Sequence, residues 1–226
     1  MKESSTTIRT WLLNLIIEYG RYIIQVKTGI YILLFFATVS CSQKTFESEE
    51  AMWIYLKDPT NGYLQQKTIN DINFSIVQRP TDLLVKQELG DSINTEKIKF
   101  LREKYSKYIY FMLSMSKNNQ ELLSTTPKNR NEFGAMVNQL AFGMEEKVHL
   151  YTQQKDTIAL VDYIYPRMYG MGNATTIMFV YPREKKQLNG DYLNFTIEDL
   201  DLYTGEVKFK IPIENFKKEP KLSFKN

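Results

Sequence analysis

The chain has very few of the residues that build disulfides, zinc sites and histidine-dependent active sites. Its 226 residues include one cysteine, Cys41, and one histidine, His149. A single cysteine excludes an intramolecular disulfide, and one histidine without a second thiol leaves a zinc site little but carboxylates. A Ser-His-Asp arrangement would have to use His149, which lies between Val148 and Leu150 in a predicted strand. We therefore expect a structural histidine, no metal and no cofactor.

Sequence motifs for nucleotide binding and hydrolysis are absent as well. The chain contains no G-x-x-x-x-G-K-[ST], G-x-G-x-x-G, G-x-S-x-G or H-E-x-x-H. Its formal charge is +3, and residues 1–40 contribute +2 of it, so the remainder is nearly neutral and gives no electrostatic basis for binding nucleic acid. Ten glycines and seven prolines are few beside 15 Tyr, 13 Phe and two Trp, which indicates a folded core.

The position of the one cysteine is informative. An uncharged apolar run from Gly29 to Val39 follows Arg21 and Lys27 and ends at Ser40-Cys41. A basic flank, a short apolar stretch and a small residue at its end are typical of a signal peptide. The run is too short to span a bilayer comfortably, because a helix needs about 20 apolar residues. We predict a signal peptide over residues 1–40; a buried cysteine in an apolar segment is the alternative.

The sequence Val39-Ser40-Cys41 resembles the end of a lipobox, although Thr38 stands where leucine is commonest. The resemblance implies that the Cys41 thiol receives a diacylglycerol and that cleavage occurs between Ser40 and Cys41. Acyl chains on Cys41 would then hold the mature protein on a membrane. Residues 41–47 are polar and predict a lipidated tether. The alternative is an uncleaved single-pass anchor in the inner membrane.

Residues 1–25 fit a signal peptide poorly. The stretch Ile8–Ile24 is apolar but contains Glu18 and Arg21, and a charge at a helix centre costs about 2.5–3.5 kcal/mol on insertion scales. Either this is a long basic leader, or translation begins at Val26 and residues 1–25 are an upstream extension.

Residues 48–226 predict a single α+β domain. Helices are expected mainly in its first half, with Ser48, Thr81, Asn94 or Thr95, and Asn129 at their starts. Strands are expected at 69–77 and 108–115, the second apolar on both faces and therefore central. From about residue 147 the hydrophobic period becomes two, which predicts an antiparallel sheet that could form an immunoglobulin-like sandwich; its strands are expected near 148–150, 158–160, 177–181, 193–197 and 207–211.

The most distinctive stretch of the mature chain runs from Asp162 to Gly172. Tyr163, Tyr165, Arg167 and Tyr169 could form an aromatic and cationic surface, since Tyr and Arg dominate binding hot spots. The alternative is a strand that packs these tyrosines in the core. A second cluster, Glu198, Asp199 and Asp201, could bind calcium or act in hydrolysis, but it lacks an EF-hand pattern and is more typical of a solvated turn.

With these features, the chain resembles the uncharacterised outer-membrane lipoproteins of Bacteroidota. The blocks that carry the resemblance are the end at Cys41 and the segments 53–62, 163–170 and 205–209. The resemblance implies location and not activity. We expect a lipid-anchored, periplasm-facing component of the outer membrane that binds an envelope protein or a glycan without catalysis. An envelope hydrolase using carboxylates such as Asp162 or Asp199 is the alternative.

Overall fold

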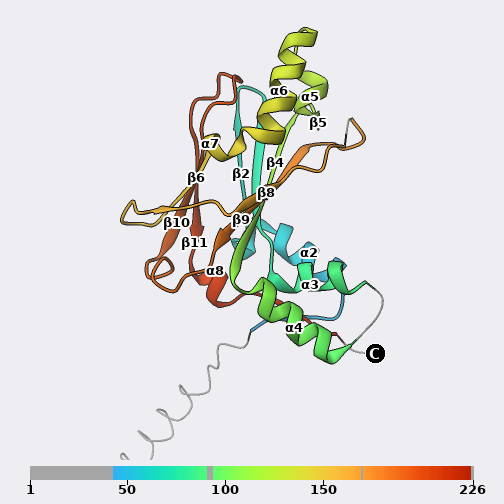
Figure 1. The fold of residues 1–226 in the computed structure, drawn as a ribbon, viewed down its shortest axis with the longest axis vertical. Helices are drawn as coiled ribbons and strands as arrows, with labels where there is room; N and C mark the ends of the chain where they lie inside the picture. The colour runs from blue at the N-terminus through green and yellow to red at the C-terminus, as the bar shows by residue number, and fades with distance from the viewer. Residues whose placement is uncertain (1–42, 91–93, 169, 225–226) are drawn as a thin grey trace, which may run out of the picture. The chain divides into compact units, whose positions relative to one another are not determined.

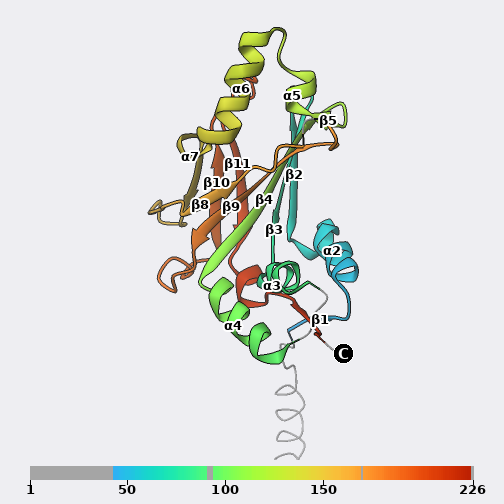
Figure 2. The same cartoon turned by 45° about the vertical axis from the view of Figure 1, so that its right-hand side comes forward.

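Two antiparallel sheets form the centre of the computed structural model, which describes residues 43–90, 94–168 and 170–224 (Figures 1 and 2). The larger sheet has the order β2-β3-β4-β9-β8, and the smaller has the order β11-β10-β6-β7. The larger sheet consists of β2 (Leu64–Ile69), β3 (Ile72–Gln78), β4 (Tyr108–Lys117), β9 (Thr175–Pro182) and β8 (Asp162–Ile164), with β5 (Gln120–Glu121) added beside β4. The smaller sheet consists of β11 (Val207–Pro212), β10 (Tyr192–Ile197), β6 (Val148–Tyr151) and β7 (Thr157–Ile158).

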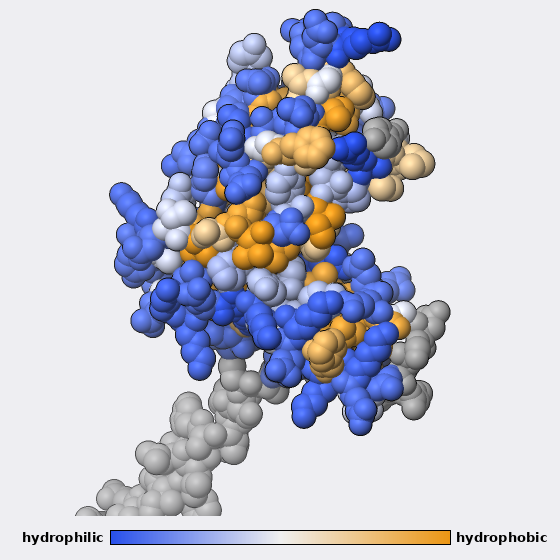
Figure 3. Space-filling model, in the orientation of Figure 1, coloured by the Kyte–Doolittle hydropathy of each residue, from blue (hydrophilic) through white to orange (hydrophobic). Residues whose placement is uncertain are grey.

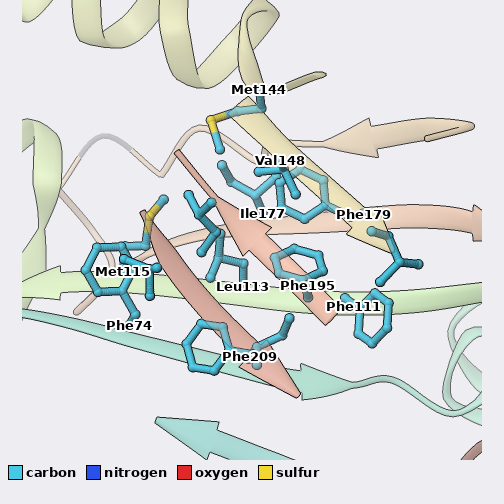
Figure 4. Close-up of a cluster of buried hydrophobic side chains, with 14 of the residues drawn as sticks. Phe74, Phe111, Leu113, Met115, Met144, Val148, Ile177, Phe179, Phe195 and Phe209 are labelled. Atoms are coloured by element: carbon cyan, nitrogen blue, oxygen red, sulfur yellow. The ribbon is translucent and has the colours of Figure 1, made fainter. Parts of the chain in front are cut away.

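Aromatic rings from both sheets meet in one core. Phe111 of β4 and Phe179 of β9 lie with their ring centroids 5.3 and 5.7 Å from that of Phe195 on β10 (Figure 4). All three side chains are fully buried, and the edge-to-face geometry is favourable for aromatic pairs. The core therefore lies between the sheets, as in a sandwich.

The predicted α+β class is confirmed. The two sheets pack face to face through one core, as in a sandwich. The larger sheet, however, combines strands from both halves of the chain, because β4 pairs with both β3 and β9. The centrality predicted for β4 follows from the same pairing. The β-rich part is therefore not confined to the chain after residue 147.

Side chains cap most of the longer helices as the sequence predicts. Ser48 accepts a hydrogen bond from the Ala51 backbone, and Asn94 and Asn129 act in the same way for their helices. The helices are α2 (Glu49–Lys57), α3 (Thr81–Leu89), α4 (Thr95–Tyr105), α5 (Leu122–Thr125), α6 (Arg130–Phe142), α7 (Met144–Lys147) and α8 (Glu214–Lys217), with a 3₁₀ turn at Pro59–Asn61. In α3 the predicted cap is wrong: Pro80 is the N-cap, and the Thr81 backbone N–H donates to the Glu219 carboxylate instead.

The strand predicted at 69–77 is in fact part of a hairpin. Asn70 and Asp71 form a two-residue turn between β2 and β3, with φ of 49° and 64°. Asn and Asp tolerate this left-handed region and suit such turns. The strand therefore begins at Ile72, and Leu64–Ile69 is a strand that the sequence patterns did not reveal.

The described part of the predicted tether belongs to the fold. Thr45–Phe46 (β1) pairs in parallel with Lys221–Leu222 (β12), and residues from Gln43 onward form one compact unit. Residues 43–47 of the predicted lipidated tether over 41–47 are therefore paired with the domain, and whether Cys41 is lipidated stays a prediction. Cys41, Ser40 and the predicted signal peptide lie outside the described residues, and among those described no helix is both long and apolar enough to cross a bilayer.

Candidate functional site

A row of apolar side chains crosses the outer face of the larger sheet. Register places Leu64 opposite Val77, Val77 opposite Met112, and Met112 opposite Met178, which in turn faces Ile164 on β8. Directly opposed residues project from the same face, so the five form a continuous line over β2, β3, β4, β9 and β8. At a strand spacing of about 4.8 Å, the line is roughly 19 Å long.

A second row of the sheet, beside the apolar one, is polar. Gln66 on β2 is opposite Ser75, Ser75 is opposite Ser114, and Ser114 is opposite Thr176. The Ser114 and Thr176 hydroxyls lie 3.1 Å apart. Hydroxyls both donate and accept hydrogen bonds, so this row could satisfy polar groups of an occupant lying on the apolar row.

Helices and a loop wall the apolar row and turn it into a groove. One hollow of about 960 Å³ lies between the sheet and α2, where Glu49 and Trp53 line it. A second, of about 600 Å³, lies beside Leu84 of α3 and Pro166, and the two hollows share Met112. Hydrophobic side chains are visible in the middle of Figure 3, over the region where β8 and β9 are drawn in Figure 1.

Arg79, which follows β3, brings a positive charge into the second hollow. Its guanidinium donates to Gln87 Oε1 at 2.7 Å and contacts Met178 Sδ at 3.7 Å. Among the residues described, no carboxylate forms an ion pair with it. Burial lowers the pKa of Arg79, yet a guanidinium remains protonated in proteins. The groove is therefore apolar along its floor, with Lys57 and Arg79 and the carboxylates of Glu49, Glu50 and Glu88 at its sides.

Comparison with known proteins adds little to this geometry. No family model matches this chain. No curated protein matches it either. A crystal structure of a novel protein of unknown function from Burkholderia pseudomallei is similar at 9% identity and a TM-score of 0.35, over 67% of this chain and 80% of that one. A similarity at this level supports no conclusion about fold or function.

The tyrosine surface predicted from the sequence is not assembled among the described residues. The Tyr163 ring stacks on Phe179 with centroids 5.9 Å apart, and Tyr165 packs against the main core. Exposed Arg167 lies over the Phe142 ring, 5.6 Å from its centroid, and Tyr169 is outside the described residues. Side chains alternate along β8, so Tyr163 faces inward and Ile164 faces outward. This segment therefore contributes Ile164, and not its tyrosines, to the groove.

A buried carboxylate shapes the loop after β8. Glu121 is 2% exposed, and its two oxygens accept hydrogen bonds from the backbone N–H groups of Gly170 and Gly172, each at 2.9 Å. The Leu122 backbone N–H donates to Thr175 Oγ1 in the same region. No sequence pattern indicates this clamp, because its partners lie about 50 residues apart.

The carboxylates considered for hydrolysis have structural roles. Asp199 accepts from the backbone N–H groups of Leu202 and Gly205, at 2.8 and 3.1 Å, so both its oxygens hold a turn. Asp162 accepts from the Tyr163 backbone at 2.8 Å. These contacts do not favour a hydrolase, and within the described part of the chain no cluster of three potential metal ligands occurs.

His149 lies at the surface of the smaller sheet and contacts an acidic residue. Its Nε2 lies 2.9 Å from Glu198 Oε1. This hydrogen bond is the main reason that the pKa of Glu198 is lowered, and Lys147 adds to it. No serine or cysteine hydroxyl or thiol is hydrogen-bonded to His149, among the residues that the structure describes, so the contact is that of a structural surface pair.

Proposed function

We propose that this chain is a lipid-anchored, periplasm-facing component of the cell envelope that binds a partner without catalysis. Acyl chains on Cys41 would hold it in the outer membrane, and the apolar groove on the larger sheet would be its binding site. The observation that carries the binding proposal is the apolar row from Leu64 to Ile164. Val77 in this row is buried against α2, whereas Met112 and Met178 are only half-buried and Ile164 is exposed.

The anchoring part depends on the sequence around Cys41 and is tested by mass. Intact-mass measurement of the protein purified from membranes should give a chain that starts at Cys41 and carries acyl groups. Cys41→Ser should abolish both cleavage and acylation, whereas the neighbouring Ser42→Ala should leave both intact. An unacylated full-length mass for the wild-type chain would contradict the proposal and favour an uncleaved anchor.

The occupant we propose is an apolar segment of another envelope protein. The floor of the groove is aliphatic and thioether, and methionine-rich surfaces adapt well to protein partners. The hydroxyl row at Ser75 and Ser114 can satisfy backbone groups of that segment. A glycan would leave most of the apolar row without matching surface.

Photo-cross-linking in the native host tests the groove directly. A benzoylphenylalanine at Ile164, which is 49% exposed in the groove, should cross-link one protein species. The same probe at Lys208, exposed on β11, should not cross-link that species. Adding Met112→Lys to the Ile164 probe should reduce the yield at least tenfold, because the ammonium would lie in the apolar row.

The matched control is Met171→Lys, since Met171 is 80% exposed and does not line the groove. It should leave the yield unchanged. Equal losses in the two lysine variants, or adducts with lipid or glycan in place of protein, would overturn the proposed occupant.

A further inference from the structure

The chain just after Cys41 is fixed to one end of the domain. The Gln43 side chain donates to the Glu219 carbonyl, and the Lys221 backbone N–H donates to the Lys44 carbonyl at 2.9 Å. The pairing of Thr45 with Lys221 continues this attachment into β1 and β12. The described chain therefore offers no flexible spacer after Gln43.

Gln43 is also a neighbour of helix α4. It lines a pocket of about 260 Å³ together with Arg102, Glu103 and Ser106. Cys41 lies two positions before Gln43, and an extended chain covers at most about 7 Å over that distance. Any acyl chains on Cys41 would thus enter the bilayer close to the C-terminal part of α4.

The outward side of α4 has the composition of a membrane-facing surface. Ile98 and Leu101 are buried against the domain, while Phe100 is 65% exposed. Phe100 precedes Glu103 by three residues, about 4.5 Å along the helix axis. Arg102 is bound to buried Asp82, and Lys104 forms an ion pair with Glu88, so the basic side chains available beside Phe100 are the exposed Lys97 and Lys99. Two lysines beside an exposed phenylalanine suit the interface of an anionic bilayer.

We propose that α4 seats the domain on the membrane, with Phe100 inserted at the level of the lipid headgroups. This inference rests on the proposed anchoring at Cys41 and adds an orientation to it. Figures 1 and 2 place α4 at one end of the described domain and α6 at the opposite end. The groove between them would then open sideways, parallel to the bilayer, where neighbouring envelope proteins can reach it.

Site-directed spin labelling of the lipidated protein tests this orientation. Cys41 is the chain's only cysteine, and acylation blocks its thiol, so Phe100→Cys provides a single labelling site. The full chain is produced in a lipidating host and reconstituted in vesicles of phosphatidylethanolamine and phosphatidylglycerol. Phe133→Cys on α6, where Phe133 is 42% exposed, is the matched control.

At each position we compare the nitroxide's collision rate with oxygen to its collision rate with a water-soluble nickel complex. The ratio of the two rates should be several-fold higher at position 100 than at position 133. Equal ratios at the two positions on acylated protein would overturn the proposed membrane contact of α4 and leave the proposed acylation of Cys41 intact. A second reactive thiol, with protein free in solution, would show that Cys41 is not acylated and would overturn both proposals.

Discussion

At the scale of single residues, Tyr181 on β9 has a buried hydroxyl with no hydrogen-bond partner among the described residues. A buried polar group left unsatisfied costs about 1–3 kcal/mol. We expect Tyr181→Phe to raise the free energy of unfolding by about 1 kcal/mol at pH 8, measured by urea unfolding. Tyr203→Phe is the control, because Tyr203 is 88% exposed, and a loss of stability in Tyr181→Phe would show that the hydroxyl has a partner.

Tyr181 should also make the free energy of unfolding fall as the pH rises above 10. Burial raises the pKa of Tyr181 above its ordinary value of 10.0, so above pH 10 the unfolded chain loses this proton while the folded protein keeps it. The stability that depends on protonated Tyr181 is fully present below pH 10, and it is lost as the pH rises toward the pKa of Tyr181 in the folded protein. For this group the loss at pH 11 is about 1.4 kcal/mol. Tyr181→Phe should remove that part of the loss, and an unchanged pH 8 to pH 11 difference would contradict it.

Asp82 joins three elements through one buried carboxylate. It accepts two hydrogen bonds from Arg102 of α4, at 2.8 and 2.7 Å, and one from the Leu222 backbone of β12 at 2.7 Å. Its side chain is 4% exposed and that of Arg102 is 38% exposed. Asp82→Asn should lower the free energy of unfolding by about 2–4 kcal/mol, because an amide N–H₂ would face these donors. Glu88→Gln, at the exposed pair with Lys104, should cause no resolvable change; equal effects would show that Asp82 is not a junction.

At the scale of elements, two glycines should respond in opposite ways to alanine. Gly134 lies inside α6 with nothing within 4 Å of an added Cβ, whereas a Cβ on Gly172 would lie 2.9 Å from Glu121 Oε1. Gly134→Ala should stabilise by about 0.5–1 kcal/mol through helix propensity. Gly172→Ala should destabilise by about 1–3 kcal/mol and speed amide exchange at Gly170, since the Glu121 clamp must shift. Chemical denaturation and hydrogen exchange measure both, and a common sign would contradict the assignment of the clamp.

The sequence predicted those elements whose signals are local. Ser48, Asn94 and Asn129 mark helix starts within a few residues of the groups they cap. The β2–β3 hairpin was missed because its turn is Asn70-Asp71, without glycine or proline to mark it.

The groove depends on register across five strands, and no short stretch of sequence carries that information. One signal was present: β4 is apolar on both faces, yet Met112 is only half-buried. A covered outer face was the expectation for that pattern. Tyr110 and Val77 on this face are indeed buried, and the accessible gap at Met112 between them marks the candidate site.

At the scale of the whole molecule, the two sheets also meet along their edges. The Gln65 side chain on β2 donates to the Lys210 carbonyl on β11, and Asn215 donates to the Gly62 carbonyl at 2.9 Å. Side chains thus occupy backbone acceptors on β11 and just before β2, which limits strand addition at these two of the four sheet edges. The groove on the larger sheet's outer face is a separate surface suited to recognition.

The N-terminal segment is part of this closed unit, and its removal should show that. Phe46 packs on Tyr55 with ring centroids 5.1 Å apart, and the Phe46 carbonyl accepts from the Ser223 backbone at 2.8 Å. Replacing residues 43–47 by a Gly-Ser stretch of equal length removes these contacts and keeps the chain length. We expect the free energy of unfolding to fall by about 2–4 kcal/mol, from lost apolar burial and interstrand hydrogen bonds. Phe46→Ala should account for part of this loss. Urea unfolding of the purified proteins gives both values. An unaltered midpoint in the Gly-Ser variant would mean that residues 43–47 are a free tether after all, and the proposed entry of the acyl chains close to α4 would fall with it.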